Sequence, residues 1–302
     1  MRILILGGTR FVGRAITEAF VNAGHDVTLF NRGSDEIDIT VRRLRGDRND
    51  PAALAPIGEQ AWDAVVDVSA YIPAQVRSVL STLGAGNPHY LYISTVSVYA
   101  ESIAPGADES APLLAVAEDI PREDPRSYGG LKALCERVLR SDFRGPLTVL
   151  RPTVVIGPRD YTDRFGWWVR AVADGGALPA PARLDQPVQL VDARDLAAFT
   201  LHCAESQAAQ TYNVVGPRER LTLGSMIDEL RAAFDVDIEL REAGTDEAQH
   251  MPLTLPQDGS RDAVFTVSNG AALDAGLQLR PLSQSALDVL AWEREREAPR
   301  RS

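Results

Sequence analysis

A tyrosine and a lysine stand four residues apart in the stretch Tyr128-Gly129-Gly130-Leu131-Lys132. On a helix, that spacing places both side chains on one face. An ammonium group beside a phenol favours the phenolate and lowers the pKa of the tyrosine, so Tyr128 could donate or accept a proton near neutral pH. Taken alone, however, such pairs are common on exposed helices that do no chemistry.

Hydroxyl groups gather at the end of an apolar run, residues 90–94, that is predicted to be a strand. There the chain reads Ser94-Thr95-Val96-Ser97-Val98-Tyr99. This stretch at a strand end, together with Tyr128 and Lys132, favours a catalytic site over an exposed helical pair.

A glycine-rich loop opens the chain, where an apolar run at residues 3–6 gives way to a helical pattern from about Val12. Glycines between a buried strand and a helix let the backbone approach a phosphate, which the positive end of the helix also attracts. A tight turn without a ligand is the alternative, but this loop follows the first strand of an alternating chain, as a dinucleotide-binding loop does. We therefore expect residues 7–13 to bind the phosphates of a dinucleotide.

Two arginines bear on the choice of cofactor. Arg10 stands where a phosphate-binding loop usually has another glycine, and Arg32 follows the second predicted strand. Folds that prefer NAD usually place a carboxylate at that second position to bind the ribose hydroxyls. An arginine there offers a fixed charge and planar donors, which suit the extra phosphate of NADP. The sequence predicts NADP, with NAD as the alternative; a solvated surface arginine is the plainer explanation for Arg32.

The elements that would position these groups alternate between strand-like and helical patterns over the first half of the chain. Strand-like runs occur at residues 3–6, 25–30, 64–67, 90–94 and 147–151, with helical patterns between them. Such alternation is typical of a parallel sheet covered by helices on both faces. We therefore expect an α/β fold, with a Rossmann-type, doubly wound parallel sheet over residues 1–156 that binds a dinucleotide.

The pattern changes after Pro152, where Pro and Gly become denser and the strands less regular. Helical patterns recur at residues 165–173, 221–234 and 282–292, and we expect residues 157–302 to form mainly a smaller C-terminal lobe that binds the substrate. Two strand-like runs, residues 188–191 and 211–214, are predicted to return to the main sheet, so that the two lobes interleave.

Composition argues against several classes of protein. Hydrophobic residues make up 45% of the 302 and charged residues 24%, as in ordinary folded proteins. The net charge of −11 argues against binding nucleic acid, whose phosphates attract clustered Lys and Arg. We expect no membrane association, because no apolar run is long enough to span, and a cytoplasmic location, because the start lacks a signal-peptide pattern. Cys135, Cys203 and the four histidines have neither disulfide nor metal-ligand spacing, so we expect no metal.

Taken in order, these motifs resemble those of the extended short-chain dehydrogenase/reductase superfamily, often called the NAD-dependent epimerase/dehydratase family. The resemblance covers nearly the whole chain and rests on the loop of residues 7–13, Gly46-Asp47, Ser94 to Tyr99, Tyr128 with Lys132, Arg151-Pro152, Gly157-Pro158, residues 191–197 and Tyr212-Asn213-Val214. A glycine loop or a Tyr/Lys pair alone is a weak signal, whereas the whole series is specific.

The resemblance implies a role for each catalytic residue. Tyr128 would exchange the proton on the substrate oxygen, and Lys132 would lower its pKa and hold the nicotinamide ribose. Thr95, or the adjacent Ser94, would orient the reacting carbonyl. Asp195 would be structural and fix a turn near the substrate lobe. The resemblance also allows a homodimer, since members of the superfamily often pair through helices that include the catalytic one.

The resemblance also places residues after the fourth strand, Asp67, Ser69 and Tyr71, beside the ribose and pyrophosphate of the cofactor. From its position after the third strand, Asp47 could accept from the adenine amino group. The full set of expected cofactor-binding residues is Gly7, Gly8, Thr9, Arg10, Phe11, Val12, Gly13, Asn31, Arg32, Asp47, Arg48, Asp67, Ser69, Tyr71, Ser94, Lys132 and Pro152.

The expected reaction follows from what the motifs lack. Dehydratases of this family usually have an Asp-Glu pair after the catalytic threonine, whereas Val96 and Ser97 follow Thr95 here. Sugar-nucleotide epimerases commonly have an Asn shortly before the Gly-Pro, and residues 153–156 contain none. We therefore expect an NAD(P)-dependent reductase or dehydrogenase that moves hydride between nicotinamide and a small carbonyl or alcohol substrate. A sugar-nucleotide epimerase is the alternative. The intact Tyr128 and Lys132 argue against a non-catalytic NAD(P)- or RNA-binding relative.

The expected substrate-binding residues are Ser97, Arg159, Arg164 and Trp168. The arginines could hold an anionic substrate, and the tryptophan could stack on a ring. Trp167 and Trp168 could instead fill the junction between the lobes, because aromatic pairs at helical spacing mostly belong to the core.

Overall fold

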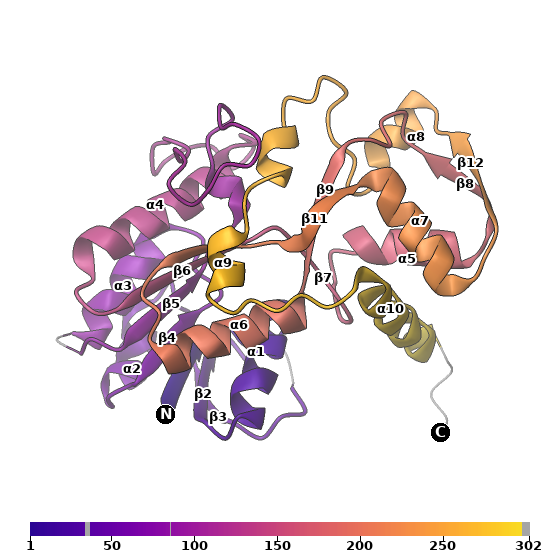
Figure 1. Cartoon of the computed structure of the whole chain (residues 1–302). Helices are drawn as coiled ribbons and strands as arrows, with labels where there is room; N and C mark the ends of the chain where they lie inside the picture. Colours follow the sequence, from indigo (N-terminus) through magenta and orange to yellow (C-terminus); the bar gives the residue numbers. More distant parts are fainter. Residues whose placement is uncertain (34–36, 85, 298–302) are drawn as a thin grey trace.

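The computed structural model describes residues 1–33, 37–84 and 86–297. Within these residues the largest element is a seven-stranded parallel sheet, in the order β10-β6-β5-β4-β1-β2-β3 (Figure 1). Its strands are β1 (Arg2–Leu6), β2 (Asp26–Asn31), β3 (Arg42–Arg45), β4 (Ala64–Asp67), β5 (His89–Ile93), β6 (Leu147–Pro152) and β10 (Thr211–Val214). The sheet confirms the predicted α/β fold with a doubly wound, Rossmann-type core.

The direction in which the sheet grows reverses beside β1. From β1 the chain adds β2 and β3 on one side, then crosses back to add β4, β5, β6 and finally β10 on the other. In open parallel sheets such a switch point leaves a crevice for a ligand at the carboxyl ends of the strands. Here the crevice lies at the ends of β1 and β4, which the glycine loop and Ser69 follow.

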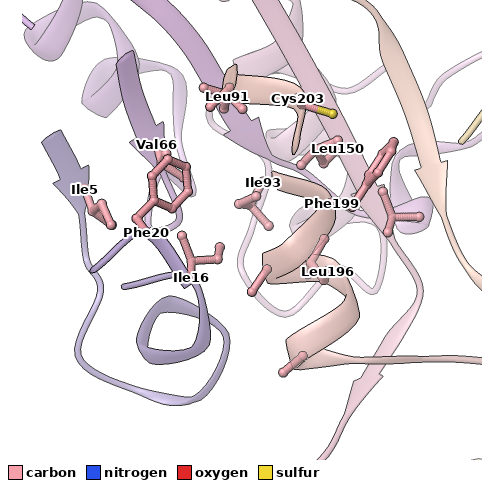
Figure 2. Packing of buried hydrophobic residues seen from close by; sticks show 14 of the residues in the cluster. Ile5, Ile16, Phe20, Val66, Leu91, Ile93, Leu150, Leu196, Phe199 and Cys203 are labelled. Atoms are coloured by element: carbon pink, nitrogen blue, oxygen red, sulfur yellow. The ribbon is translucent and has the colours of Figure 1, made fainter. Parts of the chain in front are cut away.

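Helices cover both faces of the sheet. On one face lie α1 and α6, and on the other α3 and α4 (Figure 1). Their bounds are α1 (Phe11–Asn22), α3 (Pro73–Leu83), α4 (Ser127–Asp142) and α6 (Ala193–Ser206). Ile3 and Ile5 of β1 belong to the core under α1 and α6, and Leu4 and Leu6 to the opposite core. Because successive strand side chains point to opposite faces, such apolar strands need helices on both sides. Figure 2 shows how side chains of α1 and α6 meet those of the strands in the first core.

The second lobe contains two small sheets and several helices (Figure 1). One sheet consists of β7 (Val154–Ile156), β9 (Pro187–Asp192) and β11 (Gly216–Thr222), and the other of β8 (Gly176–Ala180) and β12 (Ile238–Glu242). The helices are α5 (Arg164–Ala173), α7 (Leu223–Phe234), α8 (Thr245–His250) and α10 (Leu282–Glu297). Helices α5, α7 and α10 pack around a core of their own, which includes Phe165, Trp168 and Ile227.

Short helices occur at several of the connections between these elements. They are η1 (Pro51–Leu54), α2 (Ala55–Gly58), η2 (Val96–Val98), η3 (Asp262–Phe265) and α9 (Gly270–Asp274). Of these, η2 follows the hydroxyl-rich end of β5 and so bears directly on the site.

Both strands that were predicted to rejoin the main sheet exist, but they behave differently. β10 covers residues 211–214 and pairs with β6, as predicted. β9 covers residues 188–191 but pairs with β7 and β11, so its predicted place in the main sheet is wrong. A single residue, Thr153, separates the end of β6 from the start of β7. The chain therefore leaves the main sheet at this point, and β7 provides β9 with a parallel neighbour outside it. The predicted boundary at residue 156 coincides with the end of β7, inside this second sheet.

Within the described ranges, no helix combines the length and the apolar character that a membrane crossing requires. Residues 1–33, 37–84 and 86–297 also contain no group of three or more His, Cys, Asp or Glu side chains placed to hold a metal ion. Cys135 and Cys203 are buried free thiols.

Candidate active site

A cavity of about 690 Å³ opens at the carboxyl ends of the central strands. The glycine loop lines one part of it, and Thr95, Tyr128 and Lys132 line another. Residues from later in the chain complete the lining, among them Tyr161, Thr162, Arg164 and Phe265. The cavity therefore brings the expected cofactor loop and the expected catalytic residues together, at the crevice where sheets of this kind bind ligands.

The glycine loop is compact because its glycines stand where side chains do not fit. A Cβ on Gly13 would lie 2.7 Å from the backbone nitrogen of Gly8, and a Cβ on Gly8 would lie 2.8 Å from Leu29. Gly7 and Gly8 also have positive φ angles, of 108° and 91°. Thr17 Oγ1 lies 2.9 Å from the carbonyl oxygens of both Gly8 and Gly13 and ties the loop to α1. The loop thus brings the backbone and the start of α1 to the cavity, an arrangement that favours phosphates.

The charged residues that line the cavity are mainly cations, although the chain carries a net charge of −11. The charged residues in the described part of its lining are the carboxylate Asp47 and the basic residues Arg10, Arg32, Arg48, Lys132 and Arg164. At the end of β2, the buried Asn31 Nδ2 has no hydrogen-bond partner within the described structure. An unsatisfied donor, several cations and a glycine loop fit an anionic dinucleotide.

Arg48 and Asp67 form a buried ion pair beside the cavity. The Arg48 guanidinium donates to both carboxylate oxygens of Asp67, at 2.7 and 2.8 Å, and the Tyr90 hydroxyl donates to one of them at 2.7 Å. Burial raises the pKa of Asp67, but Arg48 and Tyr90 outweigh it and hold that pKa below its usual range. Asp67 is fully buried and is not among the described lining residues. Instead of the expected contact with a cofactor, it accepts from the Ser69 N–H at 3.1 Å and fixes that lining residue.

The remaining expected cofactor-binding residues all line the cavity: Gly7, Gly8, Thr9, Arg10, Phe11, Val12, Gly13, Asn31, Arg32, Asp47, Arg48, Ser69, Tyr71, Ser94, Lys132 and Pro152. Their contacts with a cofactor stay predictions. Because they all line one cavity, residues spread over half of the chain can contact one ligand.

Tyr128 stands in the first turn of α4, with 48% of its surface exposed, and lines the cavity together with Thr95. Partial removal of the phenol from water raises its pKa to about 12, and Tyr71 contributes in the same direction. Thr95 and the positive charge of Arg164 act the other way. Ser94, the other candidate hydroxyl, instead donates to a buried glutamate at 2.6 Å. Of the two hydroxyls, Thr95 is therefore the one that acts on the pKa of Tyr128.

Lys132 lies on the next turn of α4, and backbone carbonyls, not the phenol, hold its ammonium. Nζ is buried and donates to the carbonyl oxygens of Ile93 and Ala70, at 2.6 and 3.0 Å. It also lies 4.5 Å from the centre of the Tyr92 ring. Burial lowers the pKa of Lys132 to about 8. The expectation that Lys132 lowers the pKa of Tyr128 is wrong for this arrangement, because carbonyl groups hold the ammonium and the phenol has a pKa of about 12.

Two glycines after Tyr128 let neighbouring segments pack tightly against the start of α4. A Cβ on Gly129 would lie 1.9 Å from the carbonyl oxygen of Ser97, and a Cβ on Gly130 would lie 2.5 Å from Val116. Glycine is unfavourable inside a helix, so this close packing is a physical reason for both. Thr95 caps η2 by accepting from the Ser97 N–H at 3.1 Å. The glycines thus bring the capped turn, and Thr95 with it, against α4.

A second buried ion pair supports the strand ends. Arg151 Nη2 and Nε donate to the Glu136 carboxylate at 2.7 and 3.0 Å, and this is the glutamate that accepts from Ser94. Arg151 also donates to the Tyr99 hydroxyl at 2.9 Å, which in turn donates to Asn213 at 2.7 Å. Three of the motifs behind the family resemblance therefore meet in one hydrogen-bonded network behind the cavity.

Asp195, expected to be structural, lies in the first turn of α6. It accepts from the backbone N–H and the Nε of Arg280, at 2.9 and 2.8 Å. These contacts join α6 to the segment that leads into α10 and so tie the sheet lobe to the second lobe.

The four expected substrate-binding residues fall into two groups. Ser97 and Arg164 line the cavity. Arg159 is exposed and does not belong to the described lining. Trp168 is fully buried, donates from Nε1 to a backbone carbonyl at 2.9 Å, and packs edge-on against Trp167 with the ring centres 4.8 Å apart. It fills the core of the second lobe, so the expectation that it binds substrate is wrong.

Several lining residues were missed, of which Tyr161 is the clearest. Its side chain is 64% exposed and its ring contacts Phe11 at the start of α1. Gln75 and Phe265 also line the cavity. Tyr161 lies in a stretch without helical or strand periodicity, so no pattern in the sequence relates it to the glycine loop.

Comparison with known proteins identifies relatives of the chain. A model of the NAD dependent epimerase/dehydratase family matches residues 3–215. The chain is 28% identical over 236 residues to the chloroplast stem-loop binding protein of 41 kDa b from Arabidopsis thaliana, across 72% of this chain and 59% of that protein. It is 32% identical over 184 residues to a 2-alkyl-3-oxoalkanoate reductase from Stenotrophomonas maltophilia (strain K279a), across 53% of this chain and 52% of the reductase. The chain thus spans little more than half the length of these curated relatives.

Among solved structures, the fold resembles that of the UDP-glucose 4-epimerase of Thermus thermophilus in complex with NAD. The TM-score is 0.71 with 18% identity, and the likeness covers 99% of this chain and 100% of the epimerase. At that level of identity the likeness shows a shared fold.

Proposed function

The chain belongs to the NAD dependent epimerase/dehydratase family, and we propose that it is an NADP(H)-dependent reductase or dehydrogenase acting on a carbonyl or alcohol substrate. The observation that supports this proposal most is that Tyr128, Thr95 and the glycine loop line one cavity, whose charged residues are mainly cations. That combination supplies a proton donor, a hydroxyl for the substrate oxygen and a site for an anionic cofactor.

The protonation state of Tyr128 favours the reductive direction. With a pKa of about 12, the phenol keeps its proton at neutral pH. It would give that proton to the substrate oxygen, and Thr95 would hold the same oxygen by a hydrogen bond. A bound nicotinamide would supply the hydride to the carbonyl carbon. Lys132, which lines the same cavity, would hold the cofactor ribose.

NADP(H) is the proposed cofactor because of the charges at the ends of β1 and β2. Arg10 and Arg32 are exposed side chains that follow these strands and line the cavity. A ribose phosphate carries the charge that guanidinium groups bind best, whereas a ribose hydroxyl would call for a carboxylate at the end of β2. Titration of the purified protein with NADPH and with NADH tests this choice, and we expect tighter binding of NADPH.

Arg164 suggests the chemical class of the substrate. It lines the cavity, and its charge acts on the phenol of Tyr128, so it stands where it can meet a group attached near the reacting carbonyl. We infer a substrate with a carboxylate close to its carbonyl. The relative named 2-alkyl-3-oxoalkanoate reductase supports this inference, because a 3-oxo acid has these two groups close together on one short chain.

A sugar-nucleotide epimerase is the second candidate. The likeness to UDP-glucose 4-epimerase over the whole chain favours it. Such an enzyme oxidises and re-reduces one carbon with a retained cofactor, so it consumes no added NADPH.

The two candidates differ in their stoichiometry. We expect the protein to oxidise NADPH in equal amount with the 3-oxo acid that it reduces, when 2-alkyl-3-oxo acids of different chain length are offered. Cofactor that purifies with the protein, no consumption of added NADPH, and interconversion of UDP-glucose and UDP-galactose would contradict the reductase and support the epimerase.

A further inference from the structure

We propose that Tyr161 is a further cofactor-binding residue, which holds Arg10 against the phosphates of a bound dinucleotide and so joins the second lobe to the glycine loop. The inference rests on the proposed dinucleotide site, but it does not depend on the direction of the reaction or on the identity of the substrate.

Tyr161 reaches the glycine loop across the cavity. The central guanidinium carbon of Arg10 lies over the Tyr161 ring, 4.9 Å from its centre. Phe11 packs edge-on against the same ring, with the ring centres 6.5 Å apart. All three residues line the cavity, and Phe11 is the first residue of α1. The ring therefore stands at the positive end of α1, the part of the site that suits phosphates.

The backbone around the ring is shaped to present it. Residues 159–164 form an arch, in which Arg159 and Asp163 have positive φ angles of 72° and 57°. Inside the arch, Asp160 Oδ1 accepts from the N–H and the hydroxyl of Thr162, at 2.8 and 2.6 Å. At its end, Asp163 accepts from both terminal nitrogens of Arg170 in α5, at 2.8 and 2.6 Å. The arch is thus fixed to the second lobe by side chains other than its tyrosine.

The tyrosine itself is left largely exposed within this support. Its side chain is 64% exposed, so its contacts with Arg10 and Phe11 cover only part of the ring. An aromatic ring gains free energy when more of its surface leaves water. A dinucleotide bound along the glycine loop would cover more of this ring without any rearrangement of the arch.

A ring below a guanidinium suits phosphate binding because the two interactions use different parts of the group. The face of the ring attracts the positive charge of the guanidinium, whereas a phosphate binds through the N–H donors of that group. Contact with the ring also limits the rotamers of Arg10, so less conformational entropy is lost when the arginine binds an anion. Removal of the ring should therefore weaken cofactor binding through Arg10.

The test measures cofactor binding in the full chain, without turnover. The variants are Tyr161→Ala, Tyr161→Phe, Arg10→Ala and the double variant Arg10→Ala/Tyr161→Ala, and the readouts are the Kd and the dissociation rate of NADPH, followed by its fluorescence. We expect Tyr161→Ala to raise Kd about fivefold, mainly through faster dissociation. Tyr161→Phe keeps the ring and should bind NADPH as the wild-type protein does. The double variant should bind no more weakly than Arg10→Ala alone.

Two outcomes would overturn the inference. One is a Kd for Tyr161→Ala equal to that of the wild-type protein, including the case in which only the KM of the carbonyl substrate changes. The other is a double variant whose loss is the product of the two single losses. A wild-type protein that binds neither NADPH nor NADH would instead overturn the proposed function. Leu240→Ala, which truncates a side chain 44% exposed in β12, controls for the loss of an exposed apolar group.

Discussion

On the sheet side of the cavity, Asp67 is fully buried against Arg48, whereas on the second-lobe side the ion pair of Asp163 with Arg170 is 47% and 32% exposed. Buried pairs are costly to break, because the remaining charge is left without a partner away from water. Exposed pairs are screened by solvent and contribute little to stability. Substitution of the buried pair on the sheet side should therefore cost much stability, whereas substitution of an exposed pair on the second-lobe side should cost little.

This difference suits the two tasks that we assign to the cavity. A dinucleotide presents the same phosphates and riboses to every enzyme that uses it, so a rigid site at the strand ends serves it well. Substrates vary, and a wall made of loops and partly exposed side chains can vary with them while the sheet keeps its structure. The comparison predicts that equivalent substitutions on the two sides will have unequal costs.

The largest difference in stability is expected between two variants, one that loses the arginine of the buried ion pair and one that loses the arginine of an exposed ion pair. Arg48→Met leaves the Asp67 carboxylate buried and unpaired, and we expect it to lower the free energy of unfolding by about 3–5 kcal/mol. The matched control is Arg241→Met in β12 of the second lobe, whose ion pair with Glu247 is 51% and 41% exposed, and it should leave the free energy of unfolding nearly unchanged. Urea unfolding of both variants measures the two costs. Equal losses of unfolding free energy in the two variants would show that burial does not distinguish the two ion pairs.

The pH dependence of stability should report the buried ammonium on the sheet side. The pKa of Lys132 is about 8 in the folded protein, below the usual 10.5, because burial disfavours its charged form. Between these two pH values the unfolded chain binds more protons than the folded one, so the free energy of unfolding rises with pH. The full shift corresponds to about 3 kcal/mol. Wild-type protein should therefore gain stability relative to Lys132→Met from pH 8 to 10.5, and a constant difference would refute the assignment.

The sequence predicts the sheet side well because its groups follow strands and stand in short motifs. The glycine loop, Tyr128 and Lys132 were all located from local patterns, and the structure brings them to one cavity. These patterns do not predict which groups a side chain contacts in the folded protein. Lys132 donates to carbonyls that belong to two other segments, near Ala70 and Ile93, so the position of its ammonium depends on the assembled fold.

The second-lobe side was predicted less well because its contacts join segments that are far apart in the chain. Trp168 is buried partly by the segment at Pro252, 84 residues later. Tyr161 meets Arg10, and β9 pairs with β7 and β11. Local periodicity correctly predicted that α5 and β9 exist, but it holds no information on which distant segment each one meets.

A moderate loss of stability is expected where α4 packs against η2, the turn that Thr95 caps. Gly129→Ala puts a Cβ 1.9 Å from the Ser97 carbonyl oxygen, so the turn must move, at about 1–3 kcal/mol. Because Thr95 belongs to that turn, kcat should fall as well. The matched control is Gly244→Ala in the second lobe, where an added Cβ meets nothing within 4 Å. A Gly129→Ala protein as stable and active as the control would show that the packing has no role.

The smallest effect predicted from the comparison of the two sides concerns cofactor choice at the end of β2. Arg32→Ala removes an exposed guanidinium that lines the cavity, and the loss of a charge-assisted contact should raise the Kd of NADPH about tenfold. Binding of NADH, which lacks the extra phosphate, should stay the same. Isothermal titration with both cofactors measures the two constants. If both weaken equally, or neither changes, Arg32 does not select NADP(H).

The central claim is that Tyr128 delivers the proton that accompanies hydride transfer to a carbonyl. It is tested most directly by a single turnover of Tyr128→Phe, in which oxidation of enzyme-bound NADPH by a 3-oxo acid is followed in a stopped-flow instrument. The account predicts an unchanged Kd for NADPH and a transfer rate lower by about 10²–10⁴-fold. Transfer at the wild-type rate would contradict it.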